Sequence, residues 1–328
     1  MRLFAGSDGR LAVPGSSTFL SGRFMFINKT VVFLSCVPTF VLSFGILFGQ
    51  EIPLKPSSKT VSSEATDEKP KFLRVEKDGK QPRALQVAVA RYEIVSGPNQ
   101  GKIVDLVGAV HVGTKQYYSE LNQRFRNYDS VLYELVADPE VNNPSKRGEA
   151  GFNPVSGLQT GMKGMLDLSF QLDEVDYTPK NFVHADMSPT EFSQDMKKRN
   201  DGFLGMFARL MGAGFAVQGG KKGQQQQADM LAAMLSKDPM KMRRVMAEQF
   251  ESMDGQMAGL ADKDGKSTLL TERNRKAFEV LESELATSKK TFAIFYGAAH
   301  LVDMHERLLR DFQAKQKNVE WIDAWPLR

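Results

Sequence analysis

The segment KIVDLVGAVH, residues 102–111, joins an apolar run to a histidine through the spacing Gly-x-x-His. The segment KKTFAIFYGAAH, residues 289–300, repeats this arrangement near the other end of the chain. Each apolar run is rich in residues that favour strands and ends in glycine, which predicts a β-strand followed by a turn. The sequence therefore places His111 and His300 at matching positions, each just after a strand.

Strands and helices alternate on both sides of these two segments, which is typical of a layered α/β fold. The Val-rich stretch 84–95 is joined to the strand at 102–110 by the turn sequence SGPNQG, so the two predict a hairpin. Further strands are predicted at 130–136, 181–186 and 318–325, and helices at 114–127, from Pro189 and from His300 to about Lys315. We therefore expect one α/β domain over residues 84–328, with a mixed central sheet and flanking helices.

The middle of the chain, about residues 150–286, is predicted to be a mostly helical insertion in this domain. Its part 203–260 holds nine of the 16 methionines and a run of four glutamines. Methionine side chains are flexible and adapt to irregular surroundings. We interpret this part as a loosely specified helical insertion, a flexible lid or substrate groove, or a peripheral membrane contact.

The N-terminal region carries an apolar run of 19 residues without a charge, residues 30–48, which follows Lys29. A basic flank before an apolar core is typical of a secretory signal, and the run also reaches the length of a short membrane span. Residues 1–49 are therefore interpreted as a signal peptide cleaved after Gly49, an N-terminal anchor with possible membrane association, or a buried core helix. Residues 50–83, rich in Lys, Ser, Glu and Pro, predict a flexible linker, and the protein is expected to be exported.

Composition excludes several classes of function. The chain has one cysteine, Cys36, which lies in the apolar N-terminal run, so the folded domain has neither a disulfide framework nor a thiolate zinc site. Four of the 43 basic residues but one of the 39 acidic residues lie in residues 1–50, so the remainder is nearly neutral. A neutral domain gives no reason to expect a nucleic-acid partner. The motifs of P-loop, dinucleotide-binding and Gly-x-Ser-x-Gly proteins are absent from the sequence.

The histidines of the two Gly-x-x-His segments are candidates for chemistry. Ligands of open α/β sheets gather at the carboxyl ends of the strands. A histidine that opens a helix meets the positive end of the helix dipole, which disfavours imidazolium. The neutral ring that results can bind a metal ion or accept a proton. We expect His111 and His300 to meet across the top of one sheet.

Glu134 and Arg273 are the charged candidates. Glu134 lies in the apolar sequence SVLYELV, so it either has a partner in the core or faces water from an edge strand. Arg273 falls on the apolar stripe of the helix predicted over residues 271–285. It is either a clamp for an anion or oxyanion, or the partner of a core carboxylate.

The other two histidines are weaker candidates. His184 and Asp186 share one face of a strand, so both either line the site or face away from it. His300 and His305 are five residues apart, which does not fit the i, i+4 spacing of the HExxH zinc motif. His305 is therefore predicted to face solvent.

The order of four motifs resembles the TraB/TIKI superfamily, whose distant relatives include erythromycin esterases and ChaN-like proteins. These motifs are GAVH at 108–111, Glu134, ERN at 272–274 and GAAH at 297–300, and the resemblance spans about residues 86–325. It implies a mixed α/β core with an inserted helical region. TIKI members are described as metal-dependent proteases without an HExxH motif.

The resemblance implies a hydrolase that acts on a peptide or a small molecule. By position, His111, Glu134 and His300 match the metal or catalytic residues, and Arg273 matches the basic residue. The implied cofactor is a divalent metal ion, Mn, Co or Zn. The erythromycin esterases imply a metal-free hydrolase instead, the ChaN-like proteins imply haem or ligand binding with Tyr296 as a possible ligand, and the pheromone-shutdown branch implies signalling.

Overall fold

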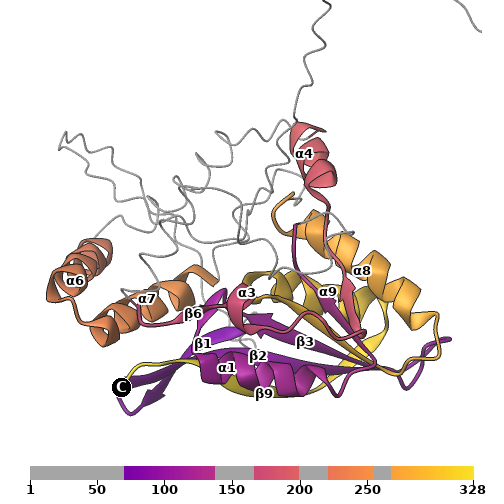
Figure 1. Cartoon of the computed structure of the whole chain (residues 1–328), viewed down its shortest axis with the longest axis horizontal. Helices are drawn as coiled ribbons and strands as arrows, with labels where there is room; N and C mark the ends of the chain where they lie inside the picture. The colour runs from indigo at the N-terminus through magenta and orange to yellow at the C-terminus, as the bar shows by residue number, and fades with distance from the viewer. Residues whose placement is uncertain (1–69, 137–165, 199–220, 255–266) are drawn as a thin grey trace, which may run out of the picture. The chain divides into compact units, whose positions relative to one another are not determined.

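The computed structural model describes residues 70–136, 166–198, 221–254 and 267–328 (Figure 1). The predicted signal or anchor at 1–49, and most of the predicted linker, lie outside these ranges. So do parts of the middle insertion. None of the helices in the described ranges combines the length and the apolar character that a membrane crossing requires.

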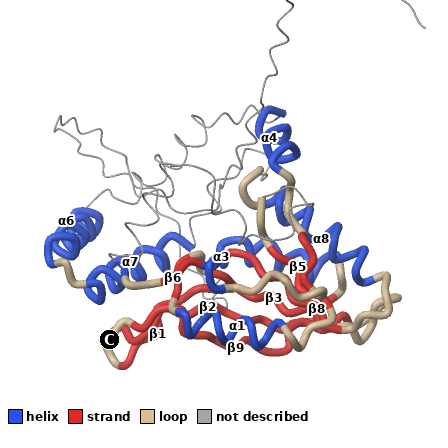
Figure 2. The backbone as a smooth tube through the Cα atoms, in the orientation of Figure 1, coloured by secondary structure: helices blue, strands red, loops and turns tan. Residues whose placement is uncertain are grey.

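One sheet of seven strands organises the described part of the chain (Figure 2). Its order is β1 (Leu73–Asp78), β2 (Gln81–Ile94), β3 (Ile103–Ala109), β8 (Thr291–Gly297), β5 (Ser130–Tyr133) and β7 (Phe182–His184), and β9 (Ala314–Pro326) pairs with β2. Strands β3, β8, β5 and β7 are mutually parallel, whereas β1, β3 and β9 are antiparallel to β2. The sheet is therefore mixed, and the predicted α/β fold class and the β2–β3 hairpin are confirmed.

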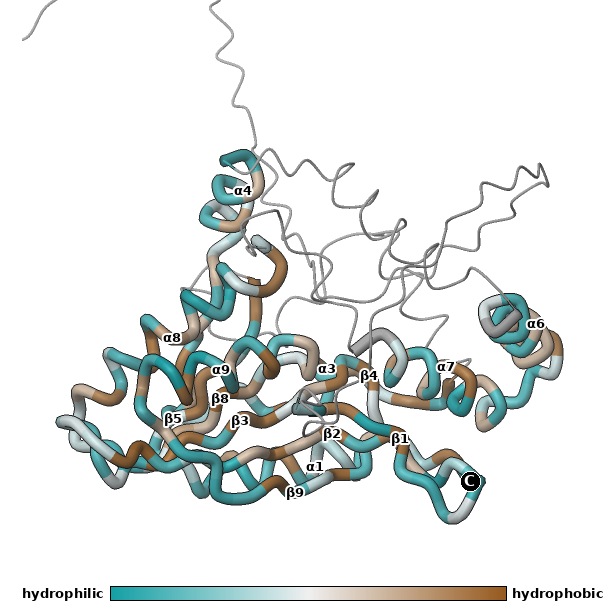
Figure 3. The backbone as a smooth tube through the Cα atoms, turned by 180° about the vertical axis from the view of Figure 1, so that it is seen from behind, coloured by the Kyte–Doolittle hydropathy of each residue, from teal (hydrophilic) through white to brown (hydrophobic). Residues whose placement is uncertain are grey.

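Both faces of this sheet are buried, as the side chains of β8 demonstrate. Phe292, Ile294 and Tyr296 belong to one apolar cluster. Ala293 and Phe295, which alternate with them, belong to another. A strand that is covered on both faces reads as a continuous apolar run, and Figure 3 shows such hydrophobic stretches along the strands.

Helices from distant parts of the sequence cover the two faces. On the face with Tyr296, α8 (Thr271–Leu285) contributes Phe278 and α9 (Leu301–Asp311) contributes Met304 and Leu308. On the other face lie buried residues of α1 (Lys115–Phe125) and α7 (Pro239–Asp254). The remaining described elements are β4 (Val112–Gly113), β6 (Ser169–Phe170), α3 (Gln171–Glu174), α4 (Pro189–Lys198), α6 (Lys221–Ser236) and the short 3-10 helix η3 (Ala298–His300).

The structure corrects three predicted boundaries. The linker predicted to reach residue 83 is wrong at its end, because β1 pairs with β2 and buries Leu73 and Val75. The charged residues Arg74 and Glu76, which alternate with them, conceal this strand in the sequence. Helix α9 ends at Asp311 rather than near Lys315, because Ala314 already begins β9. The strand predicted over 130–136 ends at Tyr133, so Glu134 follows the strand instead of lying within it.

Candidate active site

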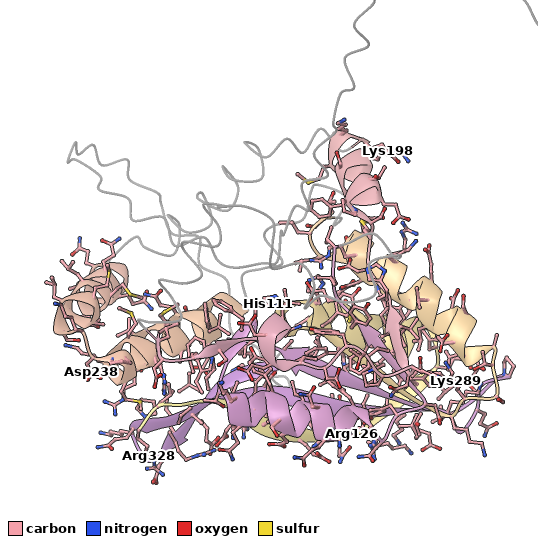
Figure 4. All side chains as sticks on the ribbon, viewed as in Figure 1. His111, Arg126, Lys198, Asp238, Lys289 and Arg328 are labelled. Atoms are coloured by element: carbon pink, nitrogen blue, oxygen red, sulfur yellow. The ribbon has the colours of Figure 1, made fainter. Side chains whose placement is uncertain are left out.

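Four adjacent parallel strands end at one edge of the sheet. Ala109 of β3 pairs with Gly297 of β8, and Tyr133 of β5 pairs with both Phe295 of β8 and His184 of β7. The strands therefore end at nearly the same level. Each is followed within three residues by a polar side chain of the candidate site, namely His111 (labelled in Figure 4), Glu134, Asp186 and His300.

Three of these side chains surround a single point above Gly297. A Cβ atom built on Gly297 would lie 3.3 Å from Oε2 of Glu134, 3.7 Å from Nε2 of His111 and 3.7 Å from Cδ2 of His300. In addition, Nε2 of His300 lies 3.6 Å from Oε1 of Glu134. The structure thus brings His111 and His300 together, as the repeated motif predicted, with Glu134 beside them, and the glycine keeps the space between them open.

Glu134 is held as a carboxylate by donors on both of its oxygens. Arg273 Nη2 donates to Oε1 at 2.6 Å, and the backbone N–H of Gly297 donates to Oε2 at 2.7 Å. Burial by itself favours the protonated acid, but Arg273, the two histidines and the Gly297 N–H outweigh it and hold the pKa of Glu134 well below its usual range. The alternative of a water-facing edge position is wrong, because β5 lies between β8 and β7 and Glu134 is 7% exposed.

Arg273 joins two carboxylates in the core. Besides its bond to Glu134, it donates from Nε and Nη2 to Asp186 at 3.0 Å and 2.6 Å. Burial opposes the charged guanidinium, but Asp186 and Glu134 raise the pKa of Arg273 well above its ordinary value. The predicted pairing with core carboxylates is therefore correct. The third guanidinium nitrogen, Nη1, is buried and has no hydrogen-bond partner among the described residues.

The proton of the His300 ring is located by its neighbours. Asn274 donates from Nδ2 to the His300 carbonyl at 3.1 Å and to Asp303 Oδ2 at 2.7 Å. Since both amide hydrogens are used, Asn274 Oδ1 must accept the 2.6 Å bond from Nδ1 of His300. Nε2 of His300 then carries a lone pair, and it is buried without a hydrogen-bond partner in the described part of the chain.

His300 is also kept neutral. Burial lowers its pKa to about 4, against the opposing effect of the Glu134 charge. At neutral pH the ring is therefore an imidazole whose free lone pair points toward the carboxylate side of the site. That is the form that can ligate a metal ion or accept a proton.

His111 has a buried glutamine as its partner. Its Nδ1 lies 3.1 Å from Oε1 of Gln171, which in turn donates from Nε2 to the Tyr177 hydroxyl at 2.8 Å. Neither Gln171 nor Tyr177 was predicted from the sequence. They carry no motif, and a glutamine in a short helix after a two-residue strand gives no periodic signal.

The remaining predicted residues divide between site and scaffold. Asp186 is part of the site because it accepts a hydrogen bond from Arg273. His184 instead donates to the Leu135 backbone carbonyl at 2.6 Å, so its role is structural. The prediction that His305 faces solvent is wrong, because its ring is half-buried and its Nδ1 bonds the Tyr92 hydroxyl at 2.7 Å. Tyr296 is fully buried with its hydroxyl donating to a backbone carbonyl, that of Ala185.

Comparisons with curated proteins and with solved structures gave no significant match. Residues 214–320 match the family model described as the TraB/PrgY/gumN family. The matched segment contains Arg273, Asn274, Gly297 and His300, whereas His111 and Glu134 precede it. The match over this segment agrees with the TraB/TIKI resemblance predicted from the motifs.

Proposed function

We propose that this protein is an exported hydrolase in which His111, His300 and Glu134 hold a divalent cation beside Arg273. One observation carries the proposal: two imidazoles and a carboxylate meet around one point above Gly297. Two nitrogen donors and one oxygen donor leave coordination positions open, as a catalytic ion requires. This donor set suits Zn, Mn or Co.

The residues fit a cation in their chemistry. His300 Nε2 is a buried lone pair without a partner in the described residues, 3.6 Å from a carboxylate oxygen. Two acceptors at that separation repel each other unless a proton or a cation lies between them. Within the described ranges, no group of three His, Cys, Asp or Glu side chains is close enough together to coordinate an ion without rearrangement. The proposal of a bound cation therefore rests on the type and orientation of the donor atoms.

The charge balance of the site points the same way. The guanidinium of Arg273 offsets only one of the two carboxylates that it binds, Glu134 and Asp186. His300 adds no positive charge at neutral pH because its pKa is about 4. An uncompensated negative charge in the core is costly, so a divalent cation would relieve it.

The site would act on a carbonyl of a peptide or of a small molecule. A bound divalent ion lowers the pKa of its water and polarises a scissile carbonyl. Asp186 fixes the Arg273 guanidinium, whose unpartnered Nη1 can donate to the oxygen on which negative charge develops. The buried setting strengthens such a contact, because it excludes water.

The experiment measures hydrolysis of peptide and ester substrates by the full chain before and after removal of metal ions by a chelator. Loss of activity after chelation, its return with Mn²⁺, Co²⁺ or Zn²⁺, and its absence in His111→Ala and His300→Ala are the expected results. The control is His305→Gln. It replaces a histidine of α9 that is hydrogen-bonded to Tyr92 of β2 and is not one of the proposed ligands. Full activity in the ion-free protein would rule out the metal part of the proposal.

A metal-free hydrolase is the second candidate, and the bonds of His300 favour it. The Asn274–Asp303 pair orients the ring, and Nε2 is free to take a proton from water as a general base. Activity that survives chelation but is lost in His300→Ala would select this mechanism. Binding of haem through Tyr296 is disfavoured, because its hydroxyl already bonds the Ala185 carbonyl.

The exported location is part of the proposal and rests on the apolar run at residues 30–48 behind Lys29. Fractionation of cells that produce the full chain tests it. Recovery outside the cytoplasm or in the membrane fraction is expected, and substitution of charged residues into the run should retain the protein inside.

A further inference from the structure

Gln171 contacts His111 at two points. Its backbone N–H donates to the His111 carbonyl at 2.9 Å, and its side-chain Oε1 lies 3.1 Å from Nδ1 of the His111 ring. Gln171 is only 5% exposed. A buried amide needs partners for its polar atoms, and this one has them in the His111 ring and the Tyr177 hydroxyl.

The surrounding chain places Gln171 rigidly beside His111. The two residues that follow His111, Val112 and Gly113, form β4 and pair with Phe170 and Ser169 of β6, directly before Gln171. Backbone pairing thus joins the segment that follows His111 to the segment that leads into Gln171. Farther along the chain, Arg243 of α7 donates to the carbonyls of Leu166 and Asp167, both at 2.6 Å, which anchors the start of the segment that carries Gln171.

The same arrangement is found at His300 with a second amide. There Asn274 accepts from Nδ1, and its two amide hydrogens are committed elsewhere, so the ring proton can lie only on Nδ1. Each histidine of the paired motifs therefore has an amide oxygen on Nδ1 and its Nε2 near Gly297 or Glu134. A hydrogen bond to one ring nitrogen determines which tautomer the ring adopts.

We propose that Gln171 is a positioning residue that holds the His111 ring in the tautomer with its proton on Nδ1. The Nε2 lone pair of His111 then faces the same point as that of His300. The consequence for catalysis rests on the proposed function, but the tautomer is a property of the free protein. An amide suits this task, because its oxygen accepts the ring N–H without adding a second charge beside Glu134.

The tautomer can be read directly by nitrogen NMR of the full chain labelled with ¹⁵N-histidine. The chain has four histidines, and single substitutions assign their signals. An N–H nitrogen and a bare ring nitrogen have well-separated shifts, so each ring reports its tautomer. The expected result, without added metal and at a pH at which neither ring is doubly protonated, is a protonated Nδ1 and a bare Nε2 for both His111 and His300.

Two variants then test the role of Gln171. Gln171→Met removes the acceptor at similar size, so His111 should lose its single tautomer while His300 keeps its own. Gln171→Glu retains an acceptor and should preserve the Nδ1–H form. Gln123→Met, at an exposed glutamine of α1, is the matched control and should leave all four signals in place. Unchanged signals of His184 and His305 show that a variant is folded.

Metal affinity adds an independent measurement. Titration with Co²⁺ alone should show Gln171→Met binding about 10- to 100-fold more weakly than the wild type, as for other residues that orient a ligating histidine. An Nε2–H tautomer of His111 in the wild type, or an unchanged Nδ1–H tautomer in Gln171→Met, would overturn the proposal. If the wild type binds no Co²⁺ but shows the expected tautomer, the proposed function fails and the role of Gln171 stands.

Discussion

Nε2 of His300 lies 3.6 Å from Oε1 of Glu134, and neither atom carries a hydrogen to share. Asn274 Oδ1 accepts a hydrogen bond from the ring N–H on the far side, and Arg273 keeps the carboxylate charged. The two acceptors nevertheless face each other in a buried site. Such an arrangement costs free energy in the absence of a ligand, and it is characteristic of functional sites rather than of structural cores.

Gly297→Ala tests the space between the three side chains. Its backbone, with φ −49°, accommodates alanine, but the new methyl group would meet Glu134 Oε2 at 3.3 Å and His111 Nε2 at 3.7 Å. We expect hydrolysis and Co²⁺ binding to be lost, while the free energy of unfolding falls by no more than about 1–3 kcal/mol.

The glycine of the first motif is the matched comparison. A Cβ on Gly108 would meet the backbone oxygen of Ala88 at 3.1 Å, which is a packing contact between β3 and β2. Gly108→Ala should therefore destabilise the fold and leave Co²⁺ affinity unchanged in the protein that remains folded. Normal activity in Gly297→Ala would show that the point above this glycine is not where the chemistry occurs.

Arg273→Met should be strongly destabilising, because it leaves Glu134 and Asp186 buried without their shared partner. Removal of one member of a buried ion pair costs about 3–5 kcal/mol. Urea denaturation followed by circular dichroism measures the change. Arg275→Met on the same helix breaks exposed pairs with Glu272 and Glu279 and should cost at most about 1 kcal/mol. Equal losses in the two variants would contradict the buried network.

A bound cation should stabilise the folded protein. At a concentration 100 times its dissociation constant, a ligand that binds only the native state contributes about 2.7 kcal/mol. We expect Mn²⁺, Co²⁺ or Zn²⁺ to raise the melting temperature of the wild type and to have no such effect on His111→Ala or His300→Ala. A similar rise in those variants would place the ion elsewhere.

Stability should depend on pH through His305. Burial lowers the pKa of this ring below its ordinary value of 6.5, against the weaker opposing effect of Glu306, and Tyr92 and Phe72 are its other neighbours. The unfolded chain therefore takes up this proton at a higher pH than the folded chain does. The contribution is fully present above pH 6.5 and is lost as the pH falls through the folded pKa.

The measurement compares the free energy of unfolding of the wild type and of His305→Gln at pH 7.5 and at pH 5.5. The difference between the two proteins should shift in favour of the variant at the lower pH, because glutamine does not titrate. A difference that is the same at both pH values would mean that His305 titrates alike in the folded and unfolded chain.

Some of the site could be predicted because its parts carry local signals. Each Gly-x-x-His follows an apolar strand, and Arg273 falls on an apolar helix stripe. Since carboxyl ends of parallel strands meet at one edge, these local facts were enough to expect that His111 and His300 meet. The role of Asp186 was left open, because its partner Arg273 lies 87 positions away in the sequence. Gln171 was not predicted, because it contacts His111, which lies 60 positions away.

The sequence by itself determined the alternation of strands and helices, the two histidine-bearing turns and the resemblance to the TraB superfamily. These features depend on side-chain periodicity and on residues that are close together in the chain. Only the tertiary structure decided which ring nitrogen of His300 keeps its proton and how Arg273 divides its bonds between Glu134 and Asp186. Those properties arise from partners that the fold brings together across the sheet. Burial there strengthens each hydrogen bond and each charge interaction, because the interior has a low dielectric constant.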